Sequence, residues 1–457
     1  MRGFARRQSV ERAIAWLDAQ LQPLDPEAVP LRMAARRVLA ESIVSNVDVP
    51  GFDRATMDGY ALAAESTEGA TSYNRLPLTV IGDSLPGRPF PHHVGAGQAV
   101  RIMTGAPMPQ GCDAVLPAEW VDRTEAISTD ERSECKPDAE RKRDSAQPED
   151  RAQPSSDERS ECKPAAERKR DSAQPEGRAQ PLSIVALAAV SPGKHVGRRG
   201  EDVTQGTALL PHGRLLRPQD LGVLSSVGIE QVHVYRRPRV RLVVTGNELL
   251  PAGSRPHGHC IADANGPMLA ALVERDGGLV DFPSLVPDEH DAVLDSLYAD
   301  ADVVIVSGGS SVGLEDLAPT LLASHGELAV HGIAMRPSSP TGFGRLEHRL
   351  VFLLPGNPVS CLCAYDFFAG RAIRALGGLS KTWPYHSIIA KLARKISSPI
   401  GRLDYARVRL VDGDVEPIAV SGASILSSTT RADGFVIVPA DSEGFAPGSE
   451  VEVWLYA

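Results

Sequence analysis

Short apolar runs alternate with helical patterns over residues 238–378, and this alternation constrains the fold more than any other feature of the chain. Each apolar run has the length of one buried strand, and each intervening stretch has the spacing of a helix packed on one face. This order is typical of a doubly wound, mostly parallel sheet, whose ligands bind at the carboxyl ends of the strands. The expected strands are VRLVV (240–244), LVDFPSLV (279–286), ADVVIVS (301–307), LAVHGIAM (328–335) and LVFLLPG (350–356), and the expected helices lie near 264–275, 288–299, 315–324 and 358–376.

The regions flanking this stretch are expected to be β-rich. Short alternating segments at the end of the chain predict a small β-barrel, and turn-rich segments in the first half predict β-rich N-terminal domains. The expected fold class is therefore multidomain α/β, with a central doubly wound domain. Four domains are expected: a connecting domain at 1–46 plus 203–237, a β-rich domain at 47–202, the α/β domain at 238–378 and the barrel at 379–457.

A duplicated segment interrupts the β-rich domain. Residues 129–154 recur at 156–181, and the whole of 129–181 lacks Val, Ile, Leu, Met, Phe, Tyr and Trp. Such a segment cannot bury enough apolar surface to offset the entropy lost on ordering, so we expect it to be disordered. A solvated arm and an arm that binds a partner through its RKR triplets both stay open.

Composition narrows the classes of function. The formal net charge of −10 argues against a nucleic-acid partner, because such binding needs dense Lys and Arg on one face. No apolar stretch approaches the roughly 20 residues of a membrane span, and the first residues lack the apolar core of a signal peptide. The six cysteines, without an export signal, favour reduced thiols, so we expect a cytoplasmic protein without a membrane partner.

Glycine-rich loops follow three of the expected strands: TGNELL, SGGSSVGLED and PGNPVSC. Such a loop presents backbone N–H groups at a helix N-terminus, which favours a bound phosphate. A tight strand–helix turn is the alternative for any one loop, but three loops at one sheet edge point to a phosphate site. The sequence has no P-loop lysine and no G-x-G-x-x-G motif, which weighs against an ordinary NTPase or a dinucleotide dehydrogenase.

Acidic residues occur at the same strand ends, namely Glu248, Asp288 and Asp316. Carboxylates at this edge would repel a phosphate unless a hard cation lies between them, and Mg²⁺ is the usual bridging cation. The alternative for each acid is a helix N-cap or a first-turn position. In the first half of the chain, Asp58 and Thr104 lie in turns that their own side chains are suited to cap, and local physics leaves their role open.

Two other clusters have plainer interpretations. HGHC at 257–260 has no second ligand pair at zinc spacing, so a turn is expected there. Cys361 and Cys363 are two residues apart on an expected helix and face different ways, so burial is expected for both.

Six motifs occur in order along the chain: VPGFDRATMDGYA, VRIMTGAPMPQGCDAV, RRGEDV, TGNEL, SGGSSVG and LPGNPVSC. In combination they resemble the molybdopterin molybdenumtransferase (MoeA) family, whose eukaryotic relative is the gephyrin E domain. The resemblance covers essentially the whole chain apart from the insert. It implies a transferase that inserts molybdate into adenylylated molybdopterin, with Mg²⁺-dependent release of AMP, to form molybdenum cofactor.

The resemblance also implies functional residues. The family's catalytic positions match Asp58, Thr104, Asp202, Glu248 and Asp316, and its metal positions match Glu248, Asp288 and Asp316. The residues implied to bind substrate are Ser307, Gly308, Gly309, Ser311, Arg336, Pro355, Gly356, Asn357 and Pro358. Within this set the SGGSSVG backbone would hold phosphate, and Arg336 would hold molybdate or the pterin phosphate.

Partners are implied as well. The family's active cleft resembles a seam where the first half of one subunit meets the α/β domain of another, so a homodimer is expected. Molybdopterin adenylyltransferase and molybdoenzyme apoproteins or chaperones are further expected partners. The same sheet and SGGSSVG loop also resemble molybdopterin adenylyltransferases, which leaves an enzyme of that kind as an alternative.

The chain departs from the family's pattern at few places. Asn247 replaces the commoner acid of TGDEL, and Ser339 and Gly332 stand where members often carry lysines. Arg336 keeps one positive charge as a planar fork. The lost cations favour, as a further alternative, a non-catalytic molybdopterin-binding scaffold. Candidates to replace the missing charges are Arg345 and Arg349.

Overall fold

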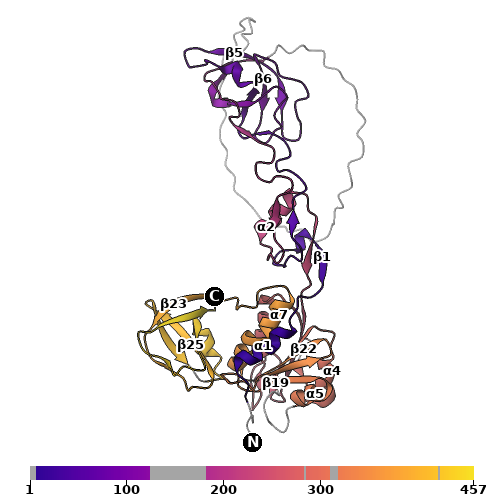
Figure 1. Ribbon diagram of the computed structural model, residues 1–457, viewed down its shortest axis with the longest axis vertical. Coiled ribbons are helices and arrows are strands. Elements are labelled where there is room, and N and C mark those ends of the chain that lie inside the picture. Colours follow the sequence, from indigo (N-terminus) through magenta and orange to yellow (C-terminus); the bar gives the residue numbers. More distant parts are fainter. Residues whose placement is uncertain (1–6, 124–181, 283–284, 309–316, 420–421, 457) are drawn as a thin grey trace, which may run out of the picture. The chain divides into compact units, whose positions relative to one another are not determined.

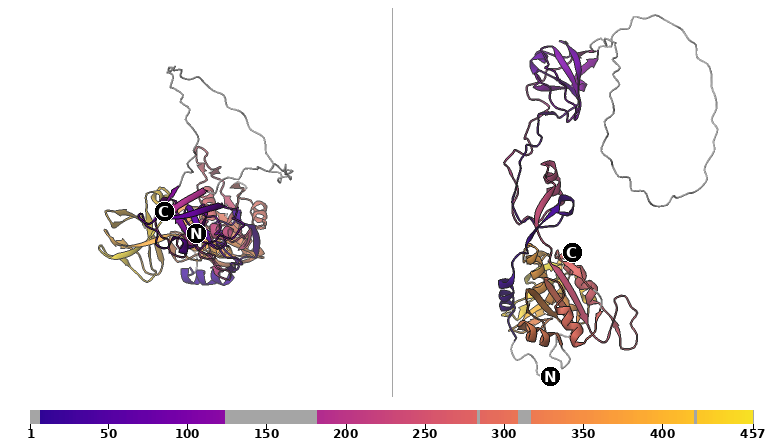
Figure 2. Two further views of the ribbon diagram at one scale, coloured as in Figure 1. Left: turned by 90° about the horizontal axis from the view of Figure 1, so that it is seen from above. Right: turned by 90° about the vertical axis from the view of Figure 1, so that its right-hand side faces the viewer.

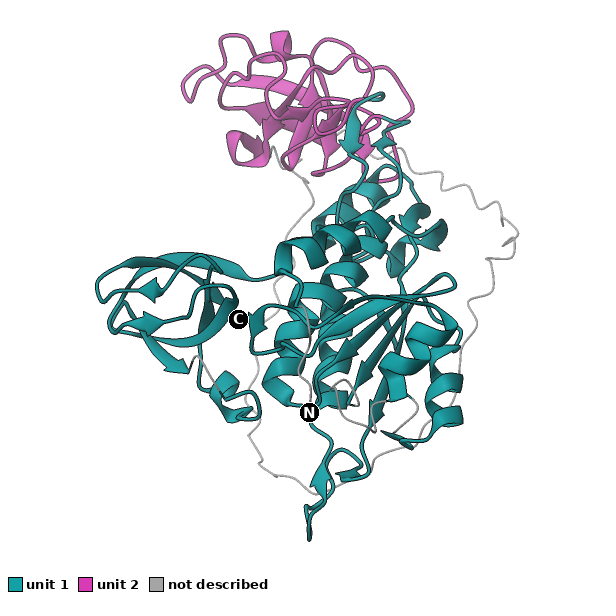
Figure 3. Cartoon of the chain, turned by 60° about the horizontal axis from the view of Figure 1, so that its bottom comes forward, with its two compact units in different colours: residues 1–47, 205–457 teal, residues 48–204 magenta. Residues whose placement is uncertain are grey.

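The computed structural model describes residues 7–123, 182–282, 285–308, 317–419 and 422–456. The chain divides into two compact units, one formed by residues 1–47 with 205–457 and the other by residues 48–204 (Figure 3). The finer division into four domains stays a prediction.

A seven-stranded sheet forms the centre of the larger unit, in the order β16-β13-β18-β22-β21-β19 with β17 beside β13. The strands around β13, β18 and β22 are parallel, whereas β21 and β19 form an antiparallel edge. The doubly wound, mostly parallel sheet expected from the sequence is therefore confirmed. The strands are β13 (Arg239–Thr245), β16 (Leu279–Asp281), β17 (Leu285–Val286), β18 (Val303–Ser307), β19 (Glu327–His331), β21 (Gly342–Leu346) and β22 (Arg349–Leu354).

Two expected strands are wrong in extent. The run expected at 279–286 contributes two separate strands, β16 and β17, and Phe282 belongs to neither. The apolar run 328–335 does not form a single strand, because Gly332 adopts a φ of 90° and ends β19 at His331. The rest of the run contributes Met335 to β20 (Met335–Arg336), which pairs with the C-terminal barrel. Strand β21 is an addition that the apolar pattern does not predict, since Gly342 and Gly344 interrupt it.

Helices cover both faces of the central sheet, because alternate strand residues point to opposite sides (Figures 1 and 2). Val240 and Ile305 belong to the core with α1, α3 and α7, whereas Val243 and Val306 belong to the core with α4 and α5. The helices are α1 (Val10–Gln20), α3 (Asn265–Arg275), α4 (His290–Leu297), α5 (Leu317–His325), α6 (Pro358–Ala364), the π-helical turn η4 (Tyr365–Ala369) and α7 (Gly370–Leu376). No helix within the described ranges is long and apolar enough to cross a membrane.

The C-terminal region closes into a barrel, as the sequence predicts. Strands β25, β26, β23, β29 and β27 pair in that order, and β27 returns to β25. The elements of this region are β23 (His386–Leu392), β24 (Ile396–Ser397), β25 (Leu403–Val411), β26 (Asp414–Ala419), α8 (Ser427–Thr430), β27 (Gly434–Val438), β28 (Gly444–Phe445) and β29 (Glu450–Leu455).

Two strand pairs in the larger unit join the start of the chain to residues beyond 205. Strand β1 pairs with β12, and β2 pairs with β11. The elements are β1 (Pro26–Pro30), η1 (Leu31–Met33), β2 (Ile43–Val44), β11 (Ala208–Leu210), α2 (Pro218–Ser226) and β12 (Gln231–Tyr235), and β14 (Leu249–Leu250) pairs with β15 (Ile261–Ala262) nearer the central sheet.

A six-stranded sheet in the order β7-β4-β6-β5-β9-β8 forms the smaller unit. Its core contains Tyr60, Leu62 and Leu116. The elements are β3 (Arg54–Ala55), β4 (Gly59–Leu62), η2 (Ala64–Thr67), β5 (Leu76–Ser84), β6 (Gln98–Ile102), β7 (Ala114–Pro117), η3 (Ala118–Trp120), β8 (Val121–Arg123), β9 (Leu182–Ala186) and β10 (Val196–Gly197).

The duplicated segment is inserted between two paired strands. Arg123 in β8 is the register partner of Ile184 in β9, so the chain leaves and re-enters the sheet at the same place. Residues 124–181, and with them the segment expected to be disordered, lie outside the described residues.

Replacing residues 129–181 with a short Gly/Ser linker is expected to preserve the fold. The cost of closing a loop falls as the loop shortens, so the free energy of unfolding should rise by no more than about 2 kcal/mol. Urea denaturation of the two proteins measures this difference. A loss of stability on deletion would show that the insert packs on the folded chain.

The two clusters with plainer interpretations behave as expected. The backbone N–H of Cys260 donates to the carbonyl of His257 at 2.9 Å, which closes a turn. Cys361 and Cys363 are both wholly buried.

Candidate active site

A pocket of about 580 Å³ lies at the carboxyl ends of β13, β18 and β22. Because these strands are parallel neighbours, the loops that follow them meet at one edge of the sheet. The pocket is lined by eight residues that the sequence analysis names: Glu248, Asp288, Ser307, Gly308, Pro355, Gly356, Asn357 and Pro358. Three others expected here, Gly309, Ser311 and Asp316, lie outside the described residues.

Gly308 lets the loop after β18 pass close to the end of β13. Its φ is 105°, and a Cβ at this position would lie 2.2 Å from the carbonyl oxygen of Thr245. Only glycine fits both the backbone angle and the space. Gly308 forms part of the pocket wall. The rest of the turn considered from the sequence lies outside the described residues.

Asn265, the first residue of α3, joins two of the loops. Its side-chain Nδ2 donates to Ser307 Oγ at 2.9 Å and to the carbonyl of Gly356 at 2.8 Å. Asn265 is buried, so these bonds are shielded from competing water. One amide group thus holds the loops after β18 and β22 in a fixed relation.

Asp263 stabilises the start of the same helix. Its Oδ1 accepts from the backbone N–H groups of Asn265 and Gly266, both at 2.9 Å. Its Oδ2 and the Oδ1 of Asn265 are buried without a partner among the described residues. Buried oxygens that lack a donor are suited to a cation or to a ligand hydroxyl.

Asp263 and Asn265 are site residues that the sequence motifs do not predict. The available signal was DANG at the expected start of a helix, where an acid two residues before the helix reads as a cap. Oδ1 of Asp263 does cap the helix. The sequence pattern does not predict that Oδ2 is buried without a partner or that Asp263 lines the pocket.

The helix-cap interpretation is wrong for the two described acids of the predicted metal site. Asp288 Oδ1 accepts from Thr245 Oγ1 at 2.9 Å, and α4 begins only at His290. Glu248 is exposed and precedes the short strand β14, not a helix. Both carboxylates are therefore free of a helix-capping duty and line the pocket.

The carboxylates of this pocket are of the type that holds a divalent cation. Glu248, Asp263 and Asp288 all line it, although among the described residues no three metal-ligating side chains gather closely enough to form a cage. Mg²⁺ commonly takes one or two protein carboxylates and completes its shell with water and substrate phosphates. The unpartnered Oδ2 of Asp263 is an oxygen of the required type.

Arg336 lines a second pocket, of about 400 Å³, beside the first. The two pockets share Pro340, Pro355 and Asn357. The guanidinium of Arg336 donates from Nη2 to Asp404 Oδ2 at 2.5 Å, so a buried carboxylate fixes its position.

The proposal that Arg345 or Arg349 replaces the missing cations is wrong. Both lie at the β21–β22 turn, whereas the pockets lie past the other end of β22. A strand advances about 3.4 Å per residue, so the six residues of β22 separate them from Pro355. Arg345 Nη1 instead donates to Gln20 Oε1 and Arg349 Nε to the carbonyl of Ala299.

In the smaller unit, Asp58 and Thr104 contact each other. Asp58 Oδ1 accepts from the backbone N–H of Thr104 at 2.7 Å and from its hydroxyl at 2.8 Å. These hydrogen bonds, the backbone one first, hold the pKa of Asp58 below its ordinary value. The pair thus links two turns 46 residues apart, and the exposed carboxylate stays ionised.

Asp202 is exposed in the neighbouring RRGED loop of the smaller unit. Two ion pairs fix this loop: Arg199 Nε lies 2.7 Å from Asp48 Oδ2, and Arg198 Nη1 lies 3.0 Å from Asp53 Oδ2. The predicted catalytic residues thus divide between the units, with Asp58, Thr104 and Asp202 in one and Glu248 in the other.

A doubly wound sheet with a polar pocket at its strand ends, joined to a β-rich unit and a barrel, defines a multidomain ligand-binding α/β protein. Three family descriptions match the chain in order: the MoeA N-terminal region (domains I and II) at 8–228, a probable molybdopterin-binding domain at 241–375 and the MoeA C-terminal region (domain IV) at 389–456. The chain belongs to the MoeA family.

Relatives match over almost the full length. Molybdopterin molybdenumtransferase 2 of Mycobacterium tuberculosis is 30% identical over 460 aligned positions, covering 98% of each chain. The molybdopterin molybdenumtransferase of Haemophilus influenzae is 29% identical, covering 94% of each. A solved structure of a molybdopterin biosynthesis MoeA protein from Pyrococcus horikoshii matches with a TM-score of 0.74 and 30% identity, covering 99% of this chain and 100% of that one.

Proposed function

We propose that this protein is a molybdopterin molybdenumtransferase, which inserts molybdate into adenylylated molybdopterin with Mg²⁺-dependent release of AMP. One observation carries the proposal: glycine-rich loops and carboxylates from three strand ends line one pocket, and Arg336 lines a second pocket beside it. Full-length relatives named for this activity support it.

The chemistry fits the residues present. Release of AMP breaks a phosphoanhydride bond, which needs neutralised charge and fixed geometry more than it needs a protein nucleophile. Asn265 and Gly308 fix the phosphate-binding loops, and Thr245 orients the carboxylate of Asp288. A bound Mg²⁺ would neutralise phosphate charge between these carboxylates.

Asp58, Thr104 and Asp202 complete the cleft from a second subunit in this proposal. They are surface residues of the smaller unit, and the hydrogen bonds from Thr104 keep Asp58 ionised. A homodimer would bring them to the partner's strand-end pocket. The same proposal includes a cytoplasmic location. It also includes three kinds of partner: molybdopterin adenylyltransferase, molybdoenzyme apoproteins and chaperones.

AMP release in the presence of adenylylated molybdopterin and Mg²⁺ is expected to rise when molybdate is added, and to stop when a chelator removes the Mg²⁺. Chromatographic quantification of AMP with and without molybdate measures this directly.

The outcomes separate the alternatives. ATP-dependent adenylylation of molybdopterin would favour the adenylyltransferase-like enzyme. Tight binding of adenylylated molybdopterin without molybdate-stimulated AMP release, under conditions where the Haemophilus influenzae relative is active, would favour the non-catalytic scaffold.

A further inference from the structure

The segment before α1 is fixed beside the second pocket. The backbone N–H of Gln8 donates to the carbonyl of Gly332 at 3.0 Å, and the N–H of Ala334 donates to the carbonyl of Gln8 at 2.8 Å. These bonds form a parallel bridge between Gln8 and Ile333. Arg7, the next residue toward the N-terminus, therefore lines the pocket.

Three arginines from distant parts of the chain meet at this pocket. Arg7, Arg336 and Arg402 line it, and its described wall contains no carboxylate. The wholly buried Asp404 accepts from Arg336 Nη2 at 2.5 Å and from Arg402 Nε at 3.0 Å. One negative charge thus offsets three positive ones, which leaves a formal excess of two.

Arg7 accounts for half of that excess. Within the described part of the chain, Arg7 has no ion pair. It lies beside the 332–340 segment, in which Gly332 and Ser339 carry no charge. Its charge is therefore available to a ligand.

The pocket also holds donors without acceptors. Arg336 Nε and Ser339 Oγ are buried, and neither has a hydrogen-bond partner among the described residues. Buried polar groups are nearly always hydrogen-bonded, so an oxygen-rich ligand is the natural partner for both. Two surplus positive charges and two free donors suit a small tetrahedral oxyanion with two negative charges.

We infer that Arg7 is an anion-binding residue, the third cation of the pocket in which Arg336 is expected to hold molybdate. This inference rests on the proposed function, because the second pocket adjoins the site where adenylylated molybdopterin would bind. Arg7, in the N-terminal segment, supplies a positive charge that Gly332 and Ser339 do not.

Arg7→Gln tests the inference by the molybdate concentration that gives half-maximal AMP release. We expect this concentration to rise about tenfold, since a hydrogen bond to a charged group is lost, while AMP release at saturating molybdate changes little. Arg7→Lys should recover part of the affinity because it keeps the charge. The matched control is Arg12→Gln, which removes an exposed arginine of α1 outside the pocket wall.

A second measurement separates this inference from the proposed function. Equilibrium dialysis of full-length protein with molybdate alone should show weaker binding for Arg7→Gln than for Arg12→Gln. If the unaltered protein releases no AMP in response to molybdate, the proposed function fails. If it does respond, and Arg7→Gln matches Arg12→Gln in both assays, the role of Arg7 is overturned. Equal losses of molybdate affinity, pterin affinity and thermal stability in Arg7→Gln would also overturn it, because they indicate a structural role.

Discussion

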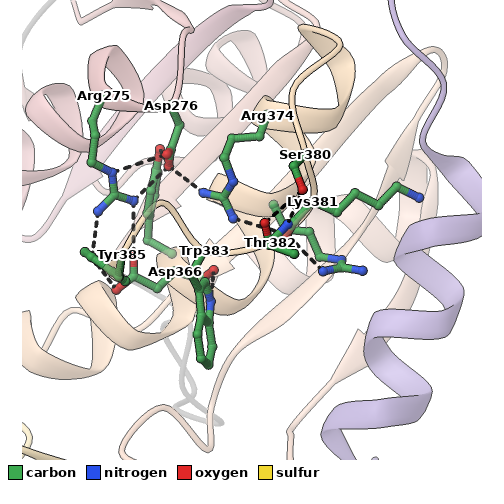
Figure 4. A network of polar contacts seen from close by, with 11 residues as sticks. Arg275, Asp276, Asp366, Arg374, Ser380, Lys381, Thr382, Trp383 and Tyr385 are labelled. Carbon is green, nitrogen blue, oxygen red and sulfur yellow. Dashed lines mark hydrogen bonds and ion pairs between the residues drawn. The ribbon is translucent and has the colours of Figure 1, made fainter. Parts of the chain in front are cut away.

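Asp276→Ala is expected to lower the free energy of unfolding by about 3–5 kcal/mol, because it leaves a buried arginine without its counter-ion. Asp276 Oδ2 lies 2.9 Å from Arg275 Nη2 and 3.0 Å from Arg374 Nη1 (Figure 4). It also accepts from the hydroxyl of Tyr365 at 3.0 Å. The side chain of Asp276 is wholly buried and that of Arg374 is 4% exposed.

The two arginines differ in what they keep after this substitution. Arg275 retains Asp366 at 3.1 Å, whereas the guanidinium of Arg374 keeps, among the described residues, only the carbonyl of Lys381 at 3.5 Å. The uncompensated charge is therefore that of Arg374. Adding Arg374→Met to Asp276→Ala should restore part of the lost stability, since it removes this charge and leaves an apolar side chain of similar length.

Asp300→Ala provides the matched control for urea denaturation. Asp300 also pairs with an arginine, at 2.6 Å from Arg239, but its side chain is 79% exposed. An exposed pair contributes no more than about 1 kcal/mol. If the two aspartate variants lost similar amounts of stability, burial of the network would not govern its energy.

The sequence was most informative where burial is complete. All residues of β18 and β22 are buried, so their apolar runs stand out from the surrounding pattern. Predictions failed where glycine or long-range pairing decides the outcome. Strand β21 contains Gly342 and Gly344, and β20 pairs with a strand almost 70 residues away, which no local pattern records.

The prediction of site residues likewise failed where contacts between distant residues decide the outcome. Loops at strand ends could be assigned to one pocket because strand order alone brings them together. Asn265 could not, because its partners Ser307 and Gly356 are 42 and 91 residues away. The sequence analysis did not single out Asp276 and Arg374, because they lie almost a hundred residues apart and only the packing of α3 against α7 brings them together and buries them.

Asp288→Asn is expected to lower molybdate-stimulated AMP release by at least about a hundredfold, a loss typical of removing one electrostatic group from a catalytic site. Asparagine keeps an acceptor for Thr245 Oγ1 but lacks the negative charge that a phosphate-bound cation requires. Folding and the shape of the pocket should therefore survive. Single-turnover AMP release over a range of Mg²⁺ concentrations measures the effect.

Asp291→Asn is the matched control, because it removes the same charge from a side chain that is 96% exposed and pairs with His290 on α4. AMP release by this variant should equal that of the unaltered protein. If Asp288→Asn retained the same rate at every Mg²⁺ concentration, the carboxylate would have only a local structural part in holding Thr245. If high Mg²⁺ restored the rate, the loss would instead come from weaker cation binding. Glu248 and Asp263 still line the pocket in this variant and could hold the cation at high concentration.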